Sequence, residues 1–139
     1  MEIRTFQYDR LVKSEDLNHH RTLFAGRCAE WFVEAGFIAA ASVLPADNIV
    51  CLKIHGLTFT QPLKSGDIAC FTSKIVHTGR TSLKVYIALA RINEKDVILN
   101  GFITFVYVND EGGAIPHGLK LEINHPEDIA LNQQAILLD

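Results

Sequence analysis

The sequence predicts an α+β fold in which a curved antiparallel sheet wraps a long central helix. Residues 16–44 hold about twenty helix-forming residues, rich in Ala, Phe, Ile and Val, with no proline before Pro45. Four stretches after residue 48 show the alternation and the β-branched content of strands. Because the helical stretch is apolar on almost every side, we expect the rest of the chain to cover it.

The central helix is predicted to end near Leu44 and to carry one narrow charged stripe, formed by Arg27, Glu30 and Glu34. Two apolar faces flank the stripe, with Phe24, Cys28, Trp31, Phe32, Ala35, Ile38, Ala39 and Ser42 on one side and Ala29, Val33, Phe37 and Ala40 on the other. Charge interrupts the apolar run too often for a membrane span.

The strands are predicted in chain order over residues 3–12, 49–59, 68–77, 82–92 and 97–109. Gly56 is a candidate β-bulge within the second of them. Pro126 followed by two acids suits the first turn of a short last helix, and we expect Ile129, Ile136 and Leu137 to dock it. Long antiparallel strands have exposed edges, so we expect these edges to pair with a second copy of the chain.

Composition narrows the class of protein. The 139 residues are enough for one domain, predicted over residues 1–139, and 48% of them are hydrophobic, which argues against disorder. A net charge of −3 gives no basic surface for nucleic acid. The first residues lack the apolar segment of a signal peptide, and the six histidines show no metal-ligand spacing. Three widely spaced cysteines are typical of free thiols in a reducing cytoplasm, although a Cys51–Cys70 disulfide stays open.

Several motifs in order resemble hotdog-fold acyl-CoA thioesterases of the acyl-CoA hydrolase branch. The loop and helix at residues 18–36 are similar to that family's pattern N-x-x-G-x-x-F-G-G followed by an acid. Residues 61–68 resemble its P-x-x-x-G-D strand entry, residues 79–85 its G-R-T-S turn, and residues 104–113 its T-F-V-x-V strand and D-x-x-G turn. The resemblance implies a hotdog fold and hydrolysis of an acyl-CoA thioester.

The chain departs from this pattern at three positions. Arg21 stands where the family has glycine, and Ala25-Gly26 replaces the glycine pair. The catalytic carboxylate of the family lies fifteen residues after the loop asparagine, which is Val33 here. Either Glu34 has taken over this role or the active site is degenerate.

The start of the helix is the predicted site for the thioester carbonyl. The unpaired N–H of Gly26, with help from that of Ala25, is the candidate oxyanion donor; the alternative is a glycine selected for close packing against a strand. As the family implies, Asn18 would orient water or the thioester, or else it only holds its own turn. Glu34 is the first candidate for the general base and Glu30 the second, because a partly desolvated acid on this helix suits that role. The alternative is an ordinary ion pair with Arg27.

Other residues have weaker candidate roles. His19 or His20 could move a proton, although neighbouring histidines in a loop usually face solvent. The resemblance places coenzyme A contacts at Arg80, Thr81 and Ser82, with added charge from Lys84 and Lys64; the alternative is a solvated turn. The aromatic residues Phe24, Trp31, Phe32 and Phe37 are expected to pack in the core or between subunits rather than to line an acyl pocket. If any of them lines such a pocket, Trp31 and Phe37 are the first candidates.

The sequence therefore favours an acyl-CoA thioesterase that assembles as a homodimer or a dimer-based tetramer or hexamer. The resemblance implies that the active sites lie between subunits, with Asn18 and the helix acid from different chains, and that coenzyme A enters only as part of the substrate. The alternative is a non-catalytic acyl-CoA binding protein, since Val33 occupies the acid position. A third hypothesis is a dehydratase that pairs His19 or His20 with Glu34.

Overall fold

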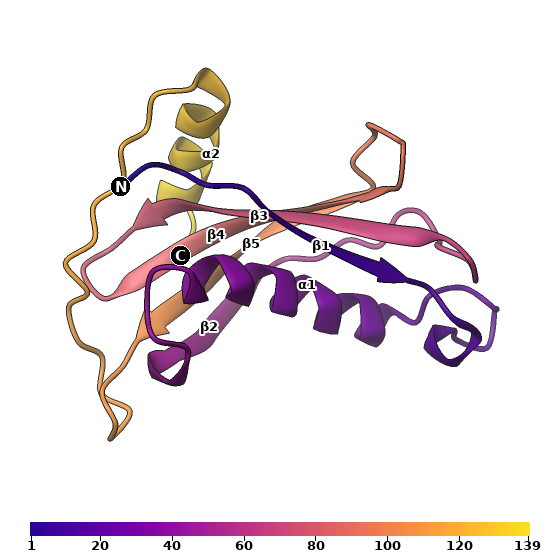
Figure 1. Ribbon diagram of the computed structural model, residues 1–139, viewed down its shortest axis with the longest axis horizontal. Helices are drawn as coiled ribbons and strands as arrows, with labels where there is room; N and C mark the ends of the chain where they lie inside the picture. Colours follow the sequence, from indigo (N-terminus) through magenta and orange to yellow (C-terminus); the bar gives the residue numbers. More distant parts are fainter.

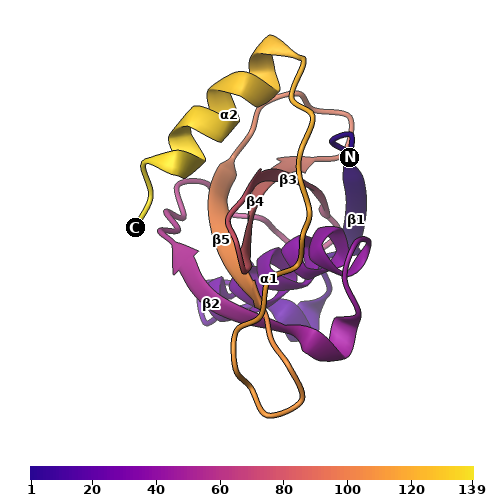
Figure 2. The ribbon, with the colours of Figure 1, turned by 90° about the vertical axis from the view of Figure 1, so that its left-hand side faces the viewer.

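The computed structural model describes residues 1–139 as one sheet with a helix on each of its faces (Figure 1). Strands β1 (Phe6–Leu11), β2 (Ile49–His55), β3 (Ile68–Thr78), β4 (Ser82–Arg91) and β5 (Leu99–Tyr107) form the sheet, and the helices are α1 (Ala25–Ala41) and α2 (Pro126–Ile136). Strand order is β1-β3-β4-β5-β2, and every neighbouring pair is antiparallel. Figure 2 shows the strands curving around α1, the predicted hotdog arrangement.

The main core lies between α1 and the concave face of the sheet. Alternate residues of β3 and β4, among them Phe71 and Val85, point toward the helix and are fully buried, as a half-covered antiparallel sheet requires. From α1, Trp31 and Phe32 enter this core. Both rings are buried there. The Arg10 guanidinium lies over the Trp31 ring, 4.7 Å from its centre. The indole N–H of Trp31 is buried without a hydrogen-bond partner.

The outer face of the sheet carries α2. Leu131 and Ala135 of this helix pack on Val76 and Phe102 in a second, smaller core. Polar contacts reinforce the docking: the Lys74 ammonium lies 2.6 Å from the Asp128 carboxylate, Asn132 donates to the Val76 carbonyl, and Lys84 donates to the carbonyls of Ala135 and Leu138 at the end of the helix.

The structure corrects several element boundaries. The first strand spans Phe6–Leu11 within the predicted residues 3–12, and the central helix ends at Ala41, before the predicted Leu44. The second strand ends at His55 because Gly56, with φ +66°, turns the chain there; the bulge lies between Cys51 and Lys53. The third strand runs one residue past its predicted end, and the last two are shorter than predicted.

The predicted start of the last helix at Pro126 is confirmed, but its docking residues are not those expected. Ile129, Ile136 and Leu137 are exposed, and Leu131 and Ala135 make the contact. The helix pattern there has two apolar sides, and only the structure shows which one faces the sheet.

The central helix is also less enclosed than predicted. Its charged stripe and Ile38 face outward, and Phe24 just before it is exposed. All three cysteines are free, with Cys28 buried, Cys70 half-buried and Cys51 exposed.

Candidate active site

The start of α1 presents unpaired backbone donors. Phe24 is the N-cap residue, and neither its side chain nor any other residue caps the helix. The N–H groups of Ala25, Gly26 and Arg27 have no hydrogen-bond partner, whereas that of Cys28 begins the helical pattern by donating to Phe24. A helix N-terminus also carries a partial positive charge, so these groups form a site for a carbonyl oxygen that gains negative charge.

Gly26 makes room for an aromatic ring. A Cβ at this position would lie 2.7 Å from Cε2 of Phe24, whose ring covers the first turn. Gly26 therefore does not pack against a strand, which was the predicted alternative. Its close neighbour is the side chain of Phe24, which is 56% exposed. An exposed ring of this kind is free to move aside.

Asn18 organises the loop that precedes the helix. Its Oδ1 accepts the N–H groups of His20 and Thr22, its backbone carbonyl accepts that of Arg21, and its Nδ2 donates to Thr22 Oγ1. The amide has two N–H bonds, so one remains for a substrate or water. Arg21 has φ +63°, a conformation that favours glycine. The loop thus keeps glycine geometry at the position where the chain departs from the family pattern.

A cavity of about 240 Å³ opens between this loop, the first turn of α1 and the segment that follows β2. Asn18 and Ala25 line it, so the structure brings the predicted loop asparagine and the helix N-terminus to one place. Most of the wall is apolar: Leu23, Cys28, Phe59, Pro62, Leu63, Leu89, Ile98 and Leu99, with Thr22, Thr60 and Gln61 as the other polar members.

The cavity wall contains residues that the sequence did not single out. Phe59, Leu89 and Leu99 come from three distant parts of the chain and belong to no short motif. None of the helix aromatics lines the cavity, so Trp31 and Phe37 do not form an acyl pocket within the single chain. Burial raises the pKa of the Cys28 thiol to about 11, so this wall stays uncharged at neutral pH.

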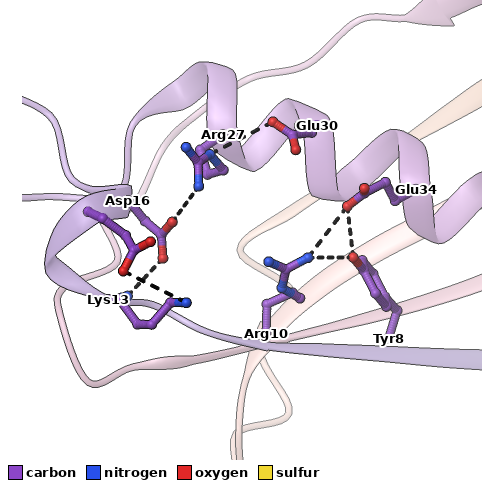
Figure 3. Close-up of polar contacts among 8 residues, drawn as sticks. Tyr8, Arg10, Lys13, Asp16, Arg27, Glu30 and Glu34 are labelled. Carbon is purple, nitrogen blue, oxygen red and sulfur yellow. Dashed lines mark hydrogen bonds and ion pairs between the residues drawn. The ribbon is translucent and has the colours of Figure 1, made fainter.

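Asp16 anchors the loop to the helix, as Figure 3 shows. Its carboxylate is 1% exposed, lies 2.6 Å from Nη1 of Arg27, and accepts the N–H of Lys13; its backbone carbonyl accepts the N–H of Phe24. The predicted Arg27–Glu30 ion pair is present but longer, at 3.8 Å. In the sequence, only the position of Asp16, two residues before Asn18, indicates that it anchors this loop.

The two candidate acids lie apart from the cavity, on the outer side of α1. The Glu34 carboxylate accepts a hydrogen bond from the Tyr8 hydroxyl at 2.7 Å and lies 3.6 Å from Arg10, both on β1 (Figure 3). Burial, followed by the hydrogen bond to Glu34, raises the pKa of Tyr8, which keeps this donor protonated. Within the single chain, the side chains of Glu30 and Glu34 are both about half exposed.

His19 and His20 stack on each other, with ring centres 4.1 Å apart, on the exposed loop. Glu34 is held at β1 by Tyr8 and Arg10. The pairing required for a dehydratase is therefore not formed within one chain.

The predicted coenzyme A contacts lie at the other end of the sheet. Arg80 and Thr81 form the β3–β4 turn, opposite the start of α1 in Figure 1. The eleven residues of β3 separate that turn from the cavity by about 35 Å at 3.4 Å per residue. Lys84 faces the outer side of the sheet, where its ammonium is already bonded to the end of α2.

No three His, Cys, Asp or Glu side chains gather in a group suited to a metal ion. Neither helix is long and apolar enough to cross a membrane.

A family model described as the thioesterase superfamily matches residues 20–98. The chain is 23% identical over 124 residues to YkhA of Bacillus subtilis, named an uncharacterized acyl-CoA thioester hydrolase; the match covers 83% of this chain and 72% of YkhA. These matches bear out the resemblance that the motifs indicated.

Solved structures are similar over nearly the whole chain. An acyl-CoA hydrolase from Bacillus cereus is 25% identical, with a TM-score of 0.86 over 96% of this chain and 82% of its own. A hexameric acyl-CoA thioesterase in its apo form is 26% identical, with a TM-score of 0.85 over 95% of this chain and 86% of its own. The hotdog fold is thereby confirmed.

An acyl-CoA hydrolase from Staphylococcus aureus is a third solved relative. It is 25% identical, with a TM-score of 0.77 over 95% of this chain and 82% of its own, and was solved with an aspartate replaced by alanine.

Proposed function

The chain belongs to the thioesterase superfamily, and from this premise we propose that it hydrolyses acyl-CoA thioesters to the free acid and coenzyme A. The observation that supports the proposal most directly is the set of unpaired N–H groups at Ala25, Gly26 and Arg27, beside a largely apolar cavity that Asn18 also lines. Such donors stabilise the oxyanion of acyl transfer because they are fixed before the reaction begins.

In the proposed reaction, the thioester oxygen accepts hydrogen bonds from the N–H groups of Gly26 and Ala25. The remaining N–H of the Asn18 amide donates to the attacking water or to the same oxygen. Water adds to the carbonyl carbon while a carboxylate takes its proton, and the tetrahedral intermediate then expels the coenzyme A sulfur. The protonated carboxylic acid returns the proton to that sulfur, which yields the free acid and the thiol.

The carboxylate is proposed to come from the partner subunit. Glu34 follows Gly26 by eight residues, which is about 12 Å along the helix, and its side chain turns toward β1. It therefore does not reach the cavity of its own chain. Glu34 remains the first candidate, because Tyr8 and Arg10 fix its orientation, and Glu30 is the second.

The unpaired edge of β2 is the proposed subunit contact. Val50, Leu52 and Ile54 alternate along this edge strand and are exposed, with Leu52 at 67%, a combination that monomeric proteins usually avoid. Solved relatives include hexameric acyl-CoA thioesterases. An assembly of this kind would bring Arg80, Thr81 and Ser82 of one chain toward the helix start of another, where they would hold coenzyme A. The three free thiols favour a reducing, cytoplasmic setting.

Release of free coenzyme A from short, medium, long and aryl acyl-CoA esters tests the activity. Turnover of at least one class is expected, and no turnover of any class would reject the proposal. Measurement of the oligomeric state in the same preparation checks the shared site, which a monomer that hydrolyses these esters would contradict.

Replacement of one backbone donor tests the oxyanion site. Ala25 is the first residue of α1, where proline is tolerated, and Phe24 already has the extended backbone that precedes proline. Ala25→Pro removes one N–H and should lower kcat by about 10²-fold, whereas Ala25→Ser keeps the N–H and should retain kcat. Equal kcat values for the two variants would exclude Ala25 as a donor.

A non-catalytic acyl-CoA binding protein is the second candidate function, because Val33 stands where the family carries its acid. This candidate predicts tight binding without turnover, and Val33→Asp should then create activity. The hydrolase predicts instead that Glu34→Gln, or failing that Glu30→Gln, abolishes an activity already present.

A further inference from the structure

The cavity at the start of α1 changes character with depth. Polar side chains, including Asn18, Thr60 and Gln61, share its lining with the buried side chains of Cys28, Leu89 and Leu99. Leu89 of β4 and Leu99 of β5 are direct cross-strand partners, so the sheet fixes them side by side. The cavity therefore combines a hydrogen-bonding rim with a rigid aliphatic base.

No charged side chain lines this cavity. A diphosphate, a nucleotide or the distal carboxylate of a dicarboxylic acyl group would find no counter-charge there, and burial of an unpaired charge is costly. A straight aliphatic chain carries no charge into the cavity, and its binding free energy becomes more favourable with each methylene removed from water.

We propose that Leu89 and Leu99 close the far end of the acyl pocket and so set the longest straight, uncharged acyl chain that the site accepts. The inference rests on the proposed function, because it places the thioester beside the N–H groups of Ala25 and Gly26. The chain limit follows from the packing: Leu89 and Leu99 are buried cross-strand partners, so a chain that reaches them meets a wall fixed by the sheet.

Leu89 is the residue that controls this limit. Its side chain is 2% exposed and contributes to the base, and Leu89→Ala removes three carbons from it. The pocket should then accept two to three further carbons. Leu83 is a matched control, because it lies on the same strand and is buried to the same degree but does not line the cavity.

The test is binding of S-alkyl-CoA thioethers, from two to fourteen alkyl carbons, measured by calorimetry with the full-length protein. These compounds are not hydrolysed, so the result does not depend on turnover. We expect Kd to fall about fourfold per added carbon until a break, beyond which it stops falling. Leu89→Ala should move the break two to three carbons higher, and Leu83→Ala should leave it in place.

The proposal is overturned if Kd does not depend on chain length, if the break stays in place in Leu89→Ala, or if Leu83→Ala moves it equally. Should Leu89→Ala fail to fold, Cys28→Met narrows the same cavity and should shorten the limit by one or two carbons; an unchanged break then overturns the proposal.

A protein that shows the break but releases no coenzyme A from esters refutes the hydrolase and keeps the pocket. A protein that hydrolyses the esters with no limit on chain length supports the hydrolase and refutes the pocket.

Discussion

Removal of either partner of the Asp16–Arg27 ion pair should destabilise the protein, but by unequal amounts. Arg27→Ala leaves the Asp16 carboxylate buried, with the backbone N–H of Lys13 as its only remaining hydrogen-bond donor. An uncompensated buried charge costs about 3–5 kcal/mol. Asp16→Asn keeps an oxygen for Lys13 and leaves Arg27, which is 37% exposed, able to turn to water, so a loss of about 1–2 kcal/mol is expected.

These losses are large enough to measure by thermal unfolding at fixed protein concentration. For 139 residues, an unfolding entropy of about 0.3 kcal/mol/K follows from the usual value per residue, so 3 kcal/mol lowers Tm by roughly 10 °C. The double variant should lose less than the sum of the single variants, since the second change removes the stranded charge. Equal losses from the two single variants, or additive losses in the double variant, would refute this explanation of how the Asn18 loop is held.

Three further predictions concern backbone strain, a thiol and pH. Arg21→Gly should raise the free energy of unfolding by about 0.5–1 kcal/mol in urea denaturation, because φ +63° is strained for arginine; Arg21→Ala should give no gain. Iodoacetamide should modify Cys28 far more slowly in the folded protein than after unfolding in urea, since a pKa of about 11 leaves roughly one Cys28 thiol in a thousand ionised at pH 8; comparable rates by peptide mass spectrometry would contradict this. Burial and nearby lysines lower the pKa of His55, so the folded chain binds this proton less readily than the unfolded chain, and stability should fall as pH drops below about 6.5. His55→Gln should reduce that fall, and an unchanged pH profile would argue against it.

The sequence was sufficient for the architecture because the fold depends on long, repetitive patterns. Alternation in residues 82–92 and the uninterrupted helical stretch before Pro45 each specify an element over many residues, so an error of one or two residues at an end changes little. The last helix shows the limit. Its start is marked by Pro126, yet the side that docks depends on what the sheet offers, and Val76 and Phe102 are far away in the sequence.

The candidate site was only partly predictable, for the same reason. Asn18 and Ala25 lie in one contiguous motif, and both line the cavity. Leu89, Leu99 and Phe59 meet only after the sheet has formed, and no local spacing marks them. The role proposed for Glu34 requires a second chain, and the spacing of residues in one sequence does not show which surfaces of two chains meet.

Trp31, the single tryptophan of the chain, gives the molecule an intrinsic optical reporter. Its indole is enclosed between helix and sheet, with an unpartnered N–H and a guanidinium over the ring, so its emission should be blue-shifted when the two layers are docked. Separation of α1 from the sheet would hydrate the ring and move the emission to the red, whereas loosening of α2 on the far side would leave it unchanged.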